Sequence, residues 1–395
     1  MSQPSKIYSS KEEMEIDKLR CWVEINLSYL KNNIKIIRSI ISDKLDICCV
    51  VKGNSYGLGA INIAKYLSSI GIKYFAVATL EEALELRKLG EIQDEIIIIN
   101  YTPVAEKETL IKNNLTQTLI NYEYAKKLNE QPGIVKCHIK VDTGMNRFGE
   151  KLENIERIKE IYKMKNLKVL GILSHLCRVS EFGEDPDNYT KMQINNFDAI
   201  IEQLEKEGIN VGLKHIMSSL GILRFNDKKY DLVRTGFLIY GASTEPNNEG
   251  INKLLAENNF KPVASLKCKV LTIKVIEKGE KVGYNSRFTA DQKTKIATLS
   301  MGYADGLSAA SSRNEFKVII KGNLCPIIGN ICMDTSMVEI PFDSDIKEGD
   351  IVTLFGYADD GEKHLNYKEY LNKSGTHYGE MFSKLGRRVT RIYHF

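Results

Sequence analysis

The sequence contains no long hydrophobic segment. Its longest uninterrupted aliphatic run, residues 96–99, is the length of a β-strand, whereas a membrane-spanning helix needs about 20 apolar residues. Residues 1–18 are polar and charged and lack the apolar stretch of a secretory signal. The sequence therefore predicts a protein that has no membrane segment and works in the cytoplasm.

The sequence also lacks paired cysteines and blocks of like charge. None of its eight cysteines stands in a CxxC or zinc-binding spacing, and several lie inside apolar patterns, so we expect reduced, mostly buried thiols and no metal site. The net charge is only +4, with Lys and Glu interspersed. That balance argues against nucleic acid as a partner and leaves room for a small anionic ligand.

A chain of 395 residues with 43% hydrophobic residues can bury the cores of two domains. Between residue 25 and about residue 241, short apolar runs alternate with amphipathic stretches such as 61–70, 80–89 and 195–207. The expected strands are 47–51, 74–78, 95–100, 116–120, 136–141, 169–175, 214–217 and 232–240. Eight alternations predict an α/β fold with an N-terminal (β/α)8 TIM-type barrel, in preference to a doubly wound sheet.

After about residue 260 the pattern changes to strands and turns, which predicts a separate, mainly β domain. Its expected strands are 265–276, 294–300, 316–320, 325–328, 336–340 and 350–355. The polar segment 247–259 would link the two domains. We therefore predict an N-terminal extension over residues 1–18, a cofactor-binding barrel over 19–250 and a C-terminal β domain over 251–395.

Lys52 follows the strand predicted at 47–51 and precedes a run of small and polar residues. Partial burial at a strand end lowers the pKa of an amine and frees its lone pair to attack a carbonyl. Active sites of barrels gather at the C-terminal ends of the strands. The polar residues expected at that rim with Lys52 are Lys140, Asp142, His175, Ser218, Ser219, Arg234 and Gly236. We interpret Lys52 as a Schiff-base lysine; the alternative is a lysine that ends a strand and points to water.

Such a lysine needs partners for an aldehyde cofactor that carries a phosphate. Ser218, Ser219 and Gly236 could offer small side chains and free N–H groups to a phosphate, and Tyr56 another hydroxyl. A turn or a helix N-cap is the alternative for the serines. Arg147 could orient a carboxylate or a cofactor oxygen, or it could be a solvated loop residue.

With these residues the chain resembles a known family, the alanine racemases. Members of that family use pyridoxal 5'-phosphate and combine a barrel with a C-terminal β domain. The resemblance extends from residues 20–25 to residues 388–391, nearly the whole chain. It includes the motifs at 281–285, 302–306 and 331–334.

The resemblance implies a role for each matching residue. Lys52 would carry the cofactor as an aldimine and act as one of two catalytic bases, and Tyr284 from the partner subunit of a homodimer would be the second. His175 would be bonded to that tyrosine, and Arg234 would face the pyridine nitrogen. The phosphate would be bound by Tyr56, Ser219 and Gly236. Arg147 would contact the cofactor and, with Tyr303 and Met333, the substrate carboxylate, supported by Asp334 and by Lys140, a position carbamylated in many members.

Racemisation removes the Cα proton from one face and returns a proton to the other, so two opposed bases suffice where one fixed base does not. A tyrosine in water is a poor base at neutral pH, so we expect a relay through His175 to Arg234 to assist Tyr284. An arginine does not give its proton to pyridine. The ring nitrogen would therefore stay unprotonated, and an unprotonated ring is a weaker electron sink. That should suppress transamination and decarboxylation.

Several positions depart from the common family pattern, including Gly53, Ser55, Leu58, Ser218, Arg387 and Thr390. With the segments 174–177 and 215–221, they look closer to the catalytic domains of serine/alanine racemases from glycopeptide-resistance systems. The expected activity is therefore racemisation of alanine, with serine or a wider set as the alternative, supplying D-amino acids for peptidoglycan or a related pool. Other readings are a pyridoxal-phosphate decarboxylase and a non-catalytic cofactor carrier. The Tyr284 motif and Arg234 as the ring partner argue against the decarboxylase, and the β domain with Tyr284 and Tyr303 argues against the carrier.

Overall fold

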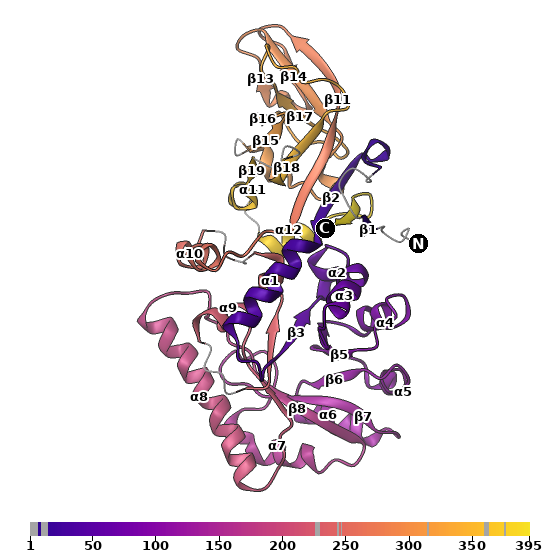
Figure 1. The fold of residues 1–395 in the computed structure, drawn as a ribbon, viewed down its shortest axis with the longest axis vertical. Coiled ribbons are helices and arrows are strands. Elements are labelled where there is room, and N and C mark those ends of the chain that lie inside the picture. The colour runs from indigo at the N-terminus through magenta and orange to yellow at the C-terminus, as the bar shows by residue number, and fades with distance from the viewer. Residues whose placement is uncertain are drawn as a thin grey trace.

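The computed structural model describes residues 7–8, 15–225, 230–242, 245, 247–313, 316–358, 363–374 and 377–395. The chain forms two lobes arranged along its long axis, a lower lobe of strands and helices and an upper lobe made mostly of strands (Figure 1). Part of the predicted N-terminal extension, residues 1–6 and 9–14, lies outside the described residues.

The lower lobe is an eight-stranded parallel sheet in the order β10-β3-β4-β5-β6-β7-β8-β9. Its strands are β3 (Asp46–Val50), β4 (Tyr74–Val77), β5 (Glu95–Ile98), β6 (Thr116–Leu119), β7 (Val135–Lys140), β8 (Leu167–Leu173), β9 (Leu213–His215) and β10 (Leu232–Thr235). The segments of the first and last strands in this order, β10 and β9, are also joined by hydrogen bonds. The N–H of Asp231 donates to Lys214 O at 2.9 Å, and the N–H of Arg234 donates to Met217 O at 3.0 Å. The predicted barrel is therefore confirmed.

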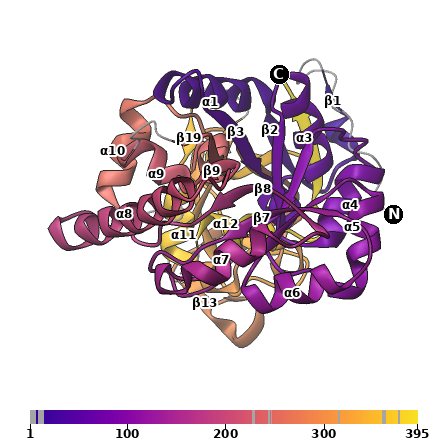
Figure 2. The same ribbon diagram turned by 90° about the horizontal axis from the view of Figure 1, so that it is seen from below.

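Helices surround the barrel, as the view from below shows (Figure 2). They are α1 (Leu27–Ile40), α3 (Ala60–Ser69), α4 (Leu80–Lys88), α5 (Lys107–Lys112), α6 (Tyr122–Glu130), α7 (Ile155–Tyr162), α8 (Glu184–Lys206) and α9 (Ser219–Arg224). Each packs an apolar stripe inward: α4, for example, buries Leu80, Ala83 and Leu86, and its N-cap Thr79 accepts from the backbone N–H of Glu82.

Two predicted elements have different bounds in the structure. The strand predicted at 232–240 ends at Thr235, and Phe237–Tyr240 form a 3-10 turn, η5. Gly236 separates them with backbone angles of φ −119° and ψ −79°, which a β-strand does not adopt. The helix predicted at 195–207 begins earlier, at Glu184, with three acidic residues in its first turn.

The upper lobe is a ten-stranded sheet in the order β1-β20-β2-β11-β14-β17-β16-β15-β18-β19. Its strands are β1 (Ile7–Tyr8), β2 (Cys21–Asn26), β11 (Ala264–Ile276), β14 (Thr294–Leu299), β15 (Lys317–Ile320), β16 (Asn323–Ile328), β17 (Ser336–Glu339), β18 (Ile351–Tyr357), β19 (His364–Leu365) and β20 (Thr390–His394). A separate hairpin joins β12 (Lys281–Val282) to β13 (Phe288–Thr289). The prediction of a mainly β C-terminal domain is confirmed.

Strand β2 lies within the range predicted for the barrel, yet it pairs antiparallel with β11 and parallel with β20 in the upper sheet. The chain thus begins its regular structure in the upper lobe and crosses into the barrel through α1. The predicted link at 247–259 contains a helix, α10 (Glu249–Glu257). None of the described helices is both long enough and apolar enough to cross a bilayer.

Candidate active site

Lys52 stands where a buried strand enters an unusual turn. The turn, α2 (Lys52–Tyr56), is left-handed: Gly53, Asn54 and Ser55 have φ values of +62°, +55° and +55°. Lys52 is half-buried at the start of this turn. Burial lowers its pKa, the positive charge of Arg147 lowers it further, and the negative charge of Glu82 raises it. A desolvated amine of lowered pKa at the rim of a barrel is suited to nucleophilic attack on a carbonyl.

The C-terminal segment closes over this turn. A Cβ at Gly57 would lie 1.9 Å from the carbonyl oxygen of Phe382, in helix α12 (Tyr378–Ser383). The guanidinium of Arg391 also donates to Gly57 O at 2.9 Å. The lysine turn is therefore in contact with residues from the far end of the chain, which sequence patterns do not reveal.

Tyr56, Ser219 and Gly236 form one small polar cluster, the Tyr56 cluster. The N–H of Gly236 donates to Ser219 Oγ at 3.0 Å. A Cβ at Gly236 would lie 2.4 Å from the Tyr56 hydroxyl, so only glycine lets the tyrosine approach this backbone. Burial raises the pKa of Tyr56, which keeps the hydroxyl protonated as a hydrogen-bond donor. Ser218 is the N-cap of α9 without a side-chain capping bond.

Arg234 lies at the centre of the rim and is held by histidines and carbonyls. Its guanidinium donates to Ser174 O at 2.5 Å and to His215 O at 2.9 Å, and Nη1 lies 2.9 Å from His215 Nδ1. His215 Nε2 lies 2.8 Å from His138 Nδ1. On the other side, Nη2 lies 3.4 Å from His175 Nδ1. Burial lowers the pKa of Arg234 to about 10, so it stays charged at neutral pH.

Because an arginine can only donate, these contacts set the protonation of the chain. Arg234 donates to Nδ1 of His215, which leaves the proton of His215 on Nε2 to be donated to His138. Burial and then the charge of Arg234 lower the pKa of His138 to about 3 and that of His215 well below its ordinary value. Sequence patterns do not single out His138 and His215 as functional candidates, because each lies within a predicted strand, 136–141 or 214–217.

The end of β7 and the loop after it add Lys140 and Arg147 to the rim. Lys140 is almost fully buried, and burial, Arg234 and Arg147 lower its pKa well below the ordinary value, against the opposing effect of Asp142. Asp142 shapes this loop, because its Oδ1 accepts from the N–H groups of Gly144 and Asn146, each at 3.0 Å. The rim is therefore electropositive and suited to an anion.

The predicted second base and two of the three residues predicted to bind the substrate carboxylate lie in the other lobe. Tyr284, Tyr303 and Met333 are 71%, 46% and 53% exposed. The backbone N–H of Tyr303 donates to Cys332 O at 3.0 Å, which ties two of the predicted segments together, and Asp334 Oδ1 accepts from Arg388 at 2.6 Å. Tyr284 lies between the strands of the β12–β13 hairpin; β13 is near the top of the upper lobe, whereas β3 is in the lower lobe (Figure 1). One chain therefore does not bring Tyr284 to Lys52.

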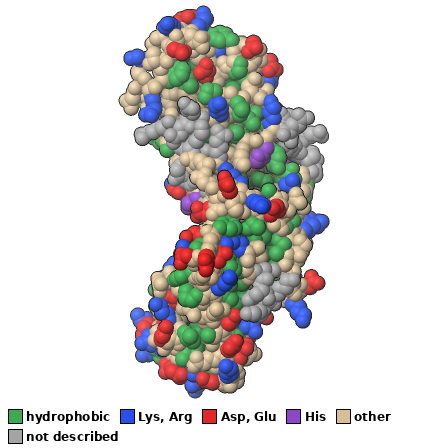
Figure 3. Space-filling model, turned by 90° about the vertical axis from the view of Figure 1, so that its left-hand side faces the viewer, with side chains coloured by type: hydrophobic (Ala, Val, Ile, Leu, Met, Phe, Trp, Pro, Cys, Tyr) green, Lys and Arg blue, Asp and Glu red, His purple; other side chains and the backbone are tan. Residues whose placement is uncertain are grey.

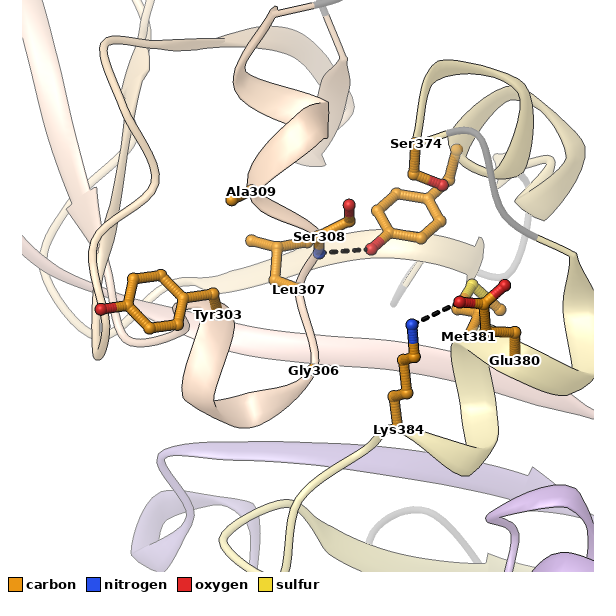
Figure 4. Close-up of a pocket in the computed structure, with 10 residues that line it drawn as sticks. Tyr303, Gly306, Leu307, Ser308, Ala309, Ser374, Glu380, Met381 and Lys384 are labelled. Carbon is orange, nitrogen blue, oxygen red and sulfur yellow. Dashed lines mark hydrogen bonds and ion pairs between the residues drawn. The ribbon is translucent and has the colours of Figure 1, made fainter.

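A cavity of about 450 Å³ lies in the upper lobe, between the Tyr303 turn and helices α11 (Tyr367–Ser374) and α12. Figure 4 shows two pairs of polar groups within it: the N–H of Ser308 donates to Tyr370 Oη at 2.8 Å, and Lys384 forms an ion pair with Glu380. It has none of the clustered cations of the barrel rim. We therefore take the rim, and not this cavity, as the candidate active site.

The surface shows no dominant charge on the face in Figure 3, where Lys and Arg are intermixed with Asp and Glu over both lobes. Across the described part of the chain, no three His, Cys, Asp or Glu side chains are grouped to hold a metal ion.

Comparison with known proteins agrees with this arrangement. Family models described as the N-terminal and C-terminal domains of alanine racemase match residues 25–244 and 263–393. "Alanine racemase 2" of Caldanaerobacter subterraneus subsp. tengcongensis is 35% identical over 377 residues, 94% of each chain. An alanine racemase structure from Clostridium difficile 630 superposes with a TM-score of 0.86 at 34% identity, covering 95% of this chain and 96% of that one. A Bartonella henselae alanine racemase with covalently bound pyridoxal phosphate has a TM-score of 0.81 at 27% identity, covering 95% and 99%.

Proposed function

This chain belongs to the alanine racemase family, and we propose that it interconverts L- and D-alanine with pyridoxal 5'-phosphate as its cofactor. One observation carries the proposal: a half-buried lysine of lowered pKa lies on a barrel rim together with Arg234 and the Tyr56 cluster. The structural relative with covalently bound pyridoxal phosphate supports the choice of cofactor.

The residues of the rim fit that cofactor. The Tyr56 cluster offers the hydroxyl groups of Tyr56 and Ser219, and Gly236 has no side chain to block the approach of a ligand. These features suit a phosphate. Arg234 is a permanent donor for a ring nitrogen. Lys52 has the nucleophilic amine that a carbonyl requires.

The bound cofactor would supply an electron sink that makes the Cα–H of the substrate acidic. Lys52 would then take or return a proton at Nζ on one face, and Tyr284 Oη of the partner subunit would do so on the other. Arg234 would donate a hydrogen bond to the ring nitrogen and keep its proton, which restricts the reaction to proton exchange at Cα. His175, 3.4 Å from Arg234, would connect the tyrosine to this charge.

Arg147, Tyr303 and Met333 would bind the substrate carboxylate, with Arg147 from one subunit and the other two from its partner. This assignment requires a homodimer. Its support is the exposure of Tyr284, Tyr303 and Met333 and the separation of strand β13, close to Tyr284 in the chain, from β3 in Figure 1.

Lys140 would carry a carbamate in the working enzyme. A buried amine of lowered pKa reacts readily with carbon dioxide, and the product would be an anion between two arginines, Arg147 and Arg234, that both act on this site. Intact mass spectrometry in bicarbonate, compared with Lys140→Ala, would detect the carbamate if it is trapped by methylation.

The experiment that tests the cofactor assignment is trapping at Lys52. Purified protein incubated with pyridoxal phosphate and reduced with borohydride should carry the pyridoxyl group on the peptide containing Lys52, and Lys52→Ala should carry none. Protein that takes up no cofactor, or that is labelled equally without Lys52, would sink the proposal.

Substrate range is the finer part of the proposal. Alanine is the expected main substrate. Serine is the alternative, because an added hydroxyl changes selectivity only modestly in an apolar pocket but strongly where a polar partner awaits it. Chiral product analysis over a panel of L-amino acids decides between an alanine racemase and a broader one.

A further inference from the structure

A carboxylate from a neighbouring helix holds the turn that carries Lys52. Glu82, in the first turn of α4, accepts from the N–H of Gly53 at 2.6 Å through Oε1 and from the N–H of Ala78 at 2.7 Å through Oε2. Gly53 directly follows Lys52, and Ala78 directly follows β4. Both oxygens of Glu82 are therefore bound to backbone groups at the ends of two adjacent strands.

The turn needs such support because its backbone is strained. Gly53, Asn54, Ser55 and Tyr56 follow one another with φ between +53° and +62°. Only glycine adopts these angles freely, and a run of them persists where the surroundings fix it. The bond to Gly53 fixes the first residue of the run, and it is a strong one because the acceptor is charged.

The negative charge of Glu82 also affects the pKa of Lys52. The titratable groups coupled electrostatically to Lys52 come from three elements: Arg147 from the loop after β7, His175 from the loop after β8 and Glu82 from α4. Arg147 lowers the pKa of Lys52 and Glu82 raises it. His175 is kept neutral by burial and by the surrounding cations. Among the described residues, Glu82 is the acid that acts on this amine.

We propose that Glu82 is a positioning residue for Lys52, which clamps the left-handed turn between the ends of β3 and β4 and places a negative charge beside the amine. The value of this clamp to catalysis rests on the proposed function. The clamp itself can be tested on the full-length chain without cofactor.

The test uses Glu82→Gln, which removes the charge and one of the two acceptors. Reductive methylation of Lys52, followed by peptide mass spectrometry across a pH series, should show its midpoint moving to lower pH, because the charge that raises the pKa is gone. Hydrogen exchange of the amides of Gly53 and Ala78 should become at least about tenfold faster, as expected for loss of a charge-assisted hydrogen bond.

Glu81→Gln is the matched control. Glu81 is the preceding residue of the same helical turn and is exposed, so the variant loses the same charge without touching the clamp and should leave both readouts unchanged. Glu82→Asp is a second variant, which keeps the charge but shortens the reach. It should speed amide exchange while moving the Lys52 midpoint less than Glu82→Gln does.

An unchanged Lys52 midpoint in Glu82→Gln, whether or not thermal stability falls, would overturn the charge role. Unchanged exchange at Gly53 and Ala78 would overturn the clamp. If wild-type protein instead takes up no pyridoxal phosphate, the proposed function fails, and the measurements on Glu82 still stand.

Discussion

Arg234 illustrates how single residues set the chemistry of the rim. Within the described part of the chain no carboxylate pairs with its buried charge, which is instead held by neutral imidazoles and carbonyl oxygens. The charge is therefore dispersed rather than cancelled. Burial, and then this charge, lower the pKa values of His175 and His215 well below the ordinary value. An anionic ligand at the rim would gain from this field.

At the residue scale, the account predicts different effects for the two bases. Tyr284→Phe should lower kcat for alanine racemisation by at least about a hundredfold, because it removes a proton carrier. Borohydride trapping at Lys52 should be unchanged. Tyr101→Phe, which alters another exposed tyrosine, is the control. Full activity in Tyr284→Phe would reject the two-base scheme.

Sequence patterns indicated candidate residues for the rim but not the backbone geometry there. Lys52, Arg234 and Gly236 could be selected because polar residues follow predicted strand ends. The left-handed turn could not, since the contacts on either side of it, from Glu82 to Gly53 and from Phe382 to Gly57, come from other elements of the fold. Leu58, which departs from the family pattern, is fully buried, and its carbonyl accepts from Tyr393, a contact that spans nearly the whole sequence.

At the scale of elements, β7, β9 and β10 are joined through the barrel interior by His138, His215 and Arg234. The space for this chain depends on β8, where a Cβ at Gly171 would lie 3.0 Å from His138 Cε1. The apolar alternation of the strands was enough to predict the barrel. It could not show which polar residues face each other inside.

This interior chain predicts acid sensitivity. The folded protein holds His138 neutral, with a pKa lowered to about 3, whereas the unfolded chain protonates it near its ordinary value of 6.5. Its contribution to stability is therefore complete above pH 6.5 and is lost as pH falls toward 3. In urea unfolding, the loss of stability between pH 7 and pH 5 should be smaller in His138→Asn than in wild type, by on the order of 2 kcal/mol. Equal losses would contradict the buried neutral histidine.

At the scale of the whole molecule, the two lobes carry separate parts of one proposed site. The sequence predicted both lobes because their strand patterns differ. It did not place β2 in the upper sheet, since a short apolar strand has the same pattern in either sheet. The two halves of the site would complete each other only between subunits.

A shared site makes a prediction about mixtures. Lys52→Ala and Tyr284→Phe should each be inactive alone, but refolding or co-expressing equal amounts should restore about a quarter of wild-type activity, since half of the dimers would hold one intact site. Size-exclusion chromatography should show the dimer in every case. A mixture that stays inactive while exchanging subunits would contradict the shared site.

The central claim is that this protein exchanges the Cα proton of alanine between its two faces. The most direct measurement incubates purified protein and pyridoxal phosphate with L-alanine in deuterated water and follows chirality and mass together. The account predicts D-alanine rising to equal amounts with L-alanine, with one deuterium at Cα in each product. Protein that binds the cofactor at Lys52 yet forms no D-alanine would contradict it.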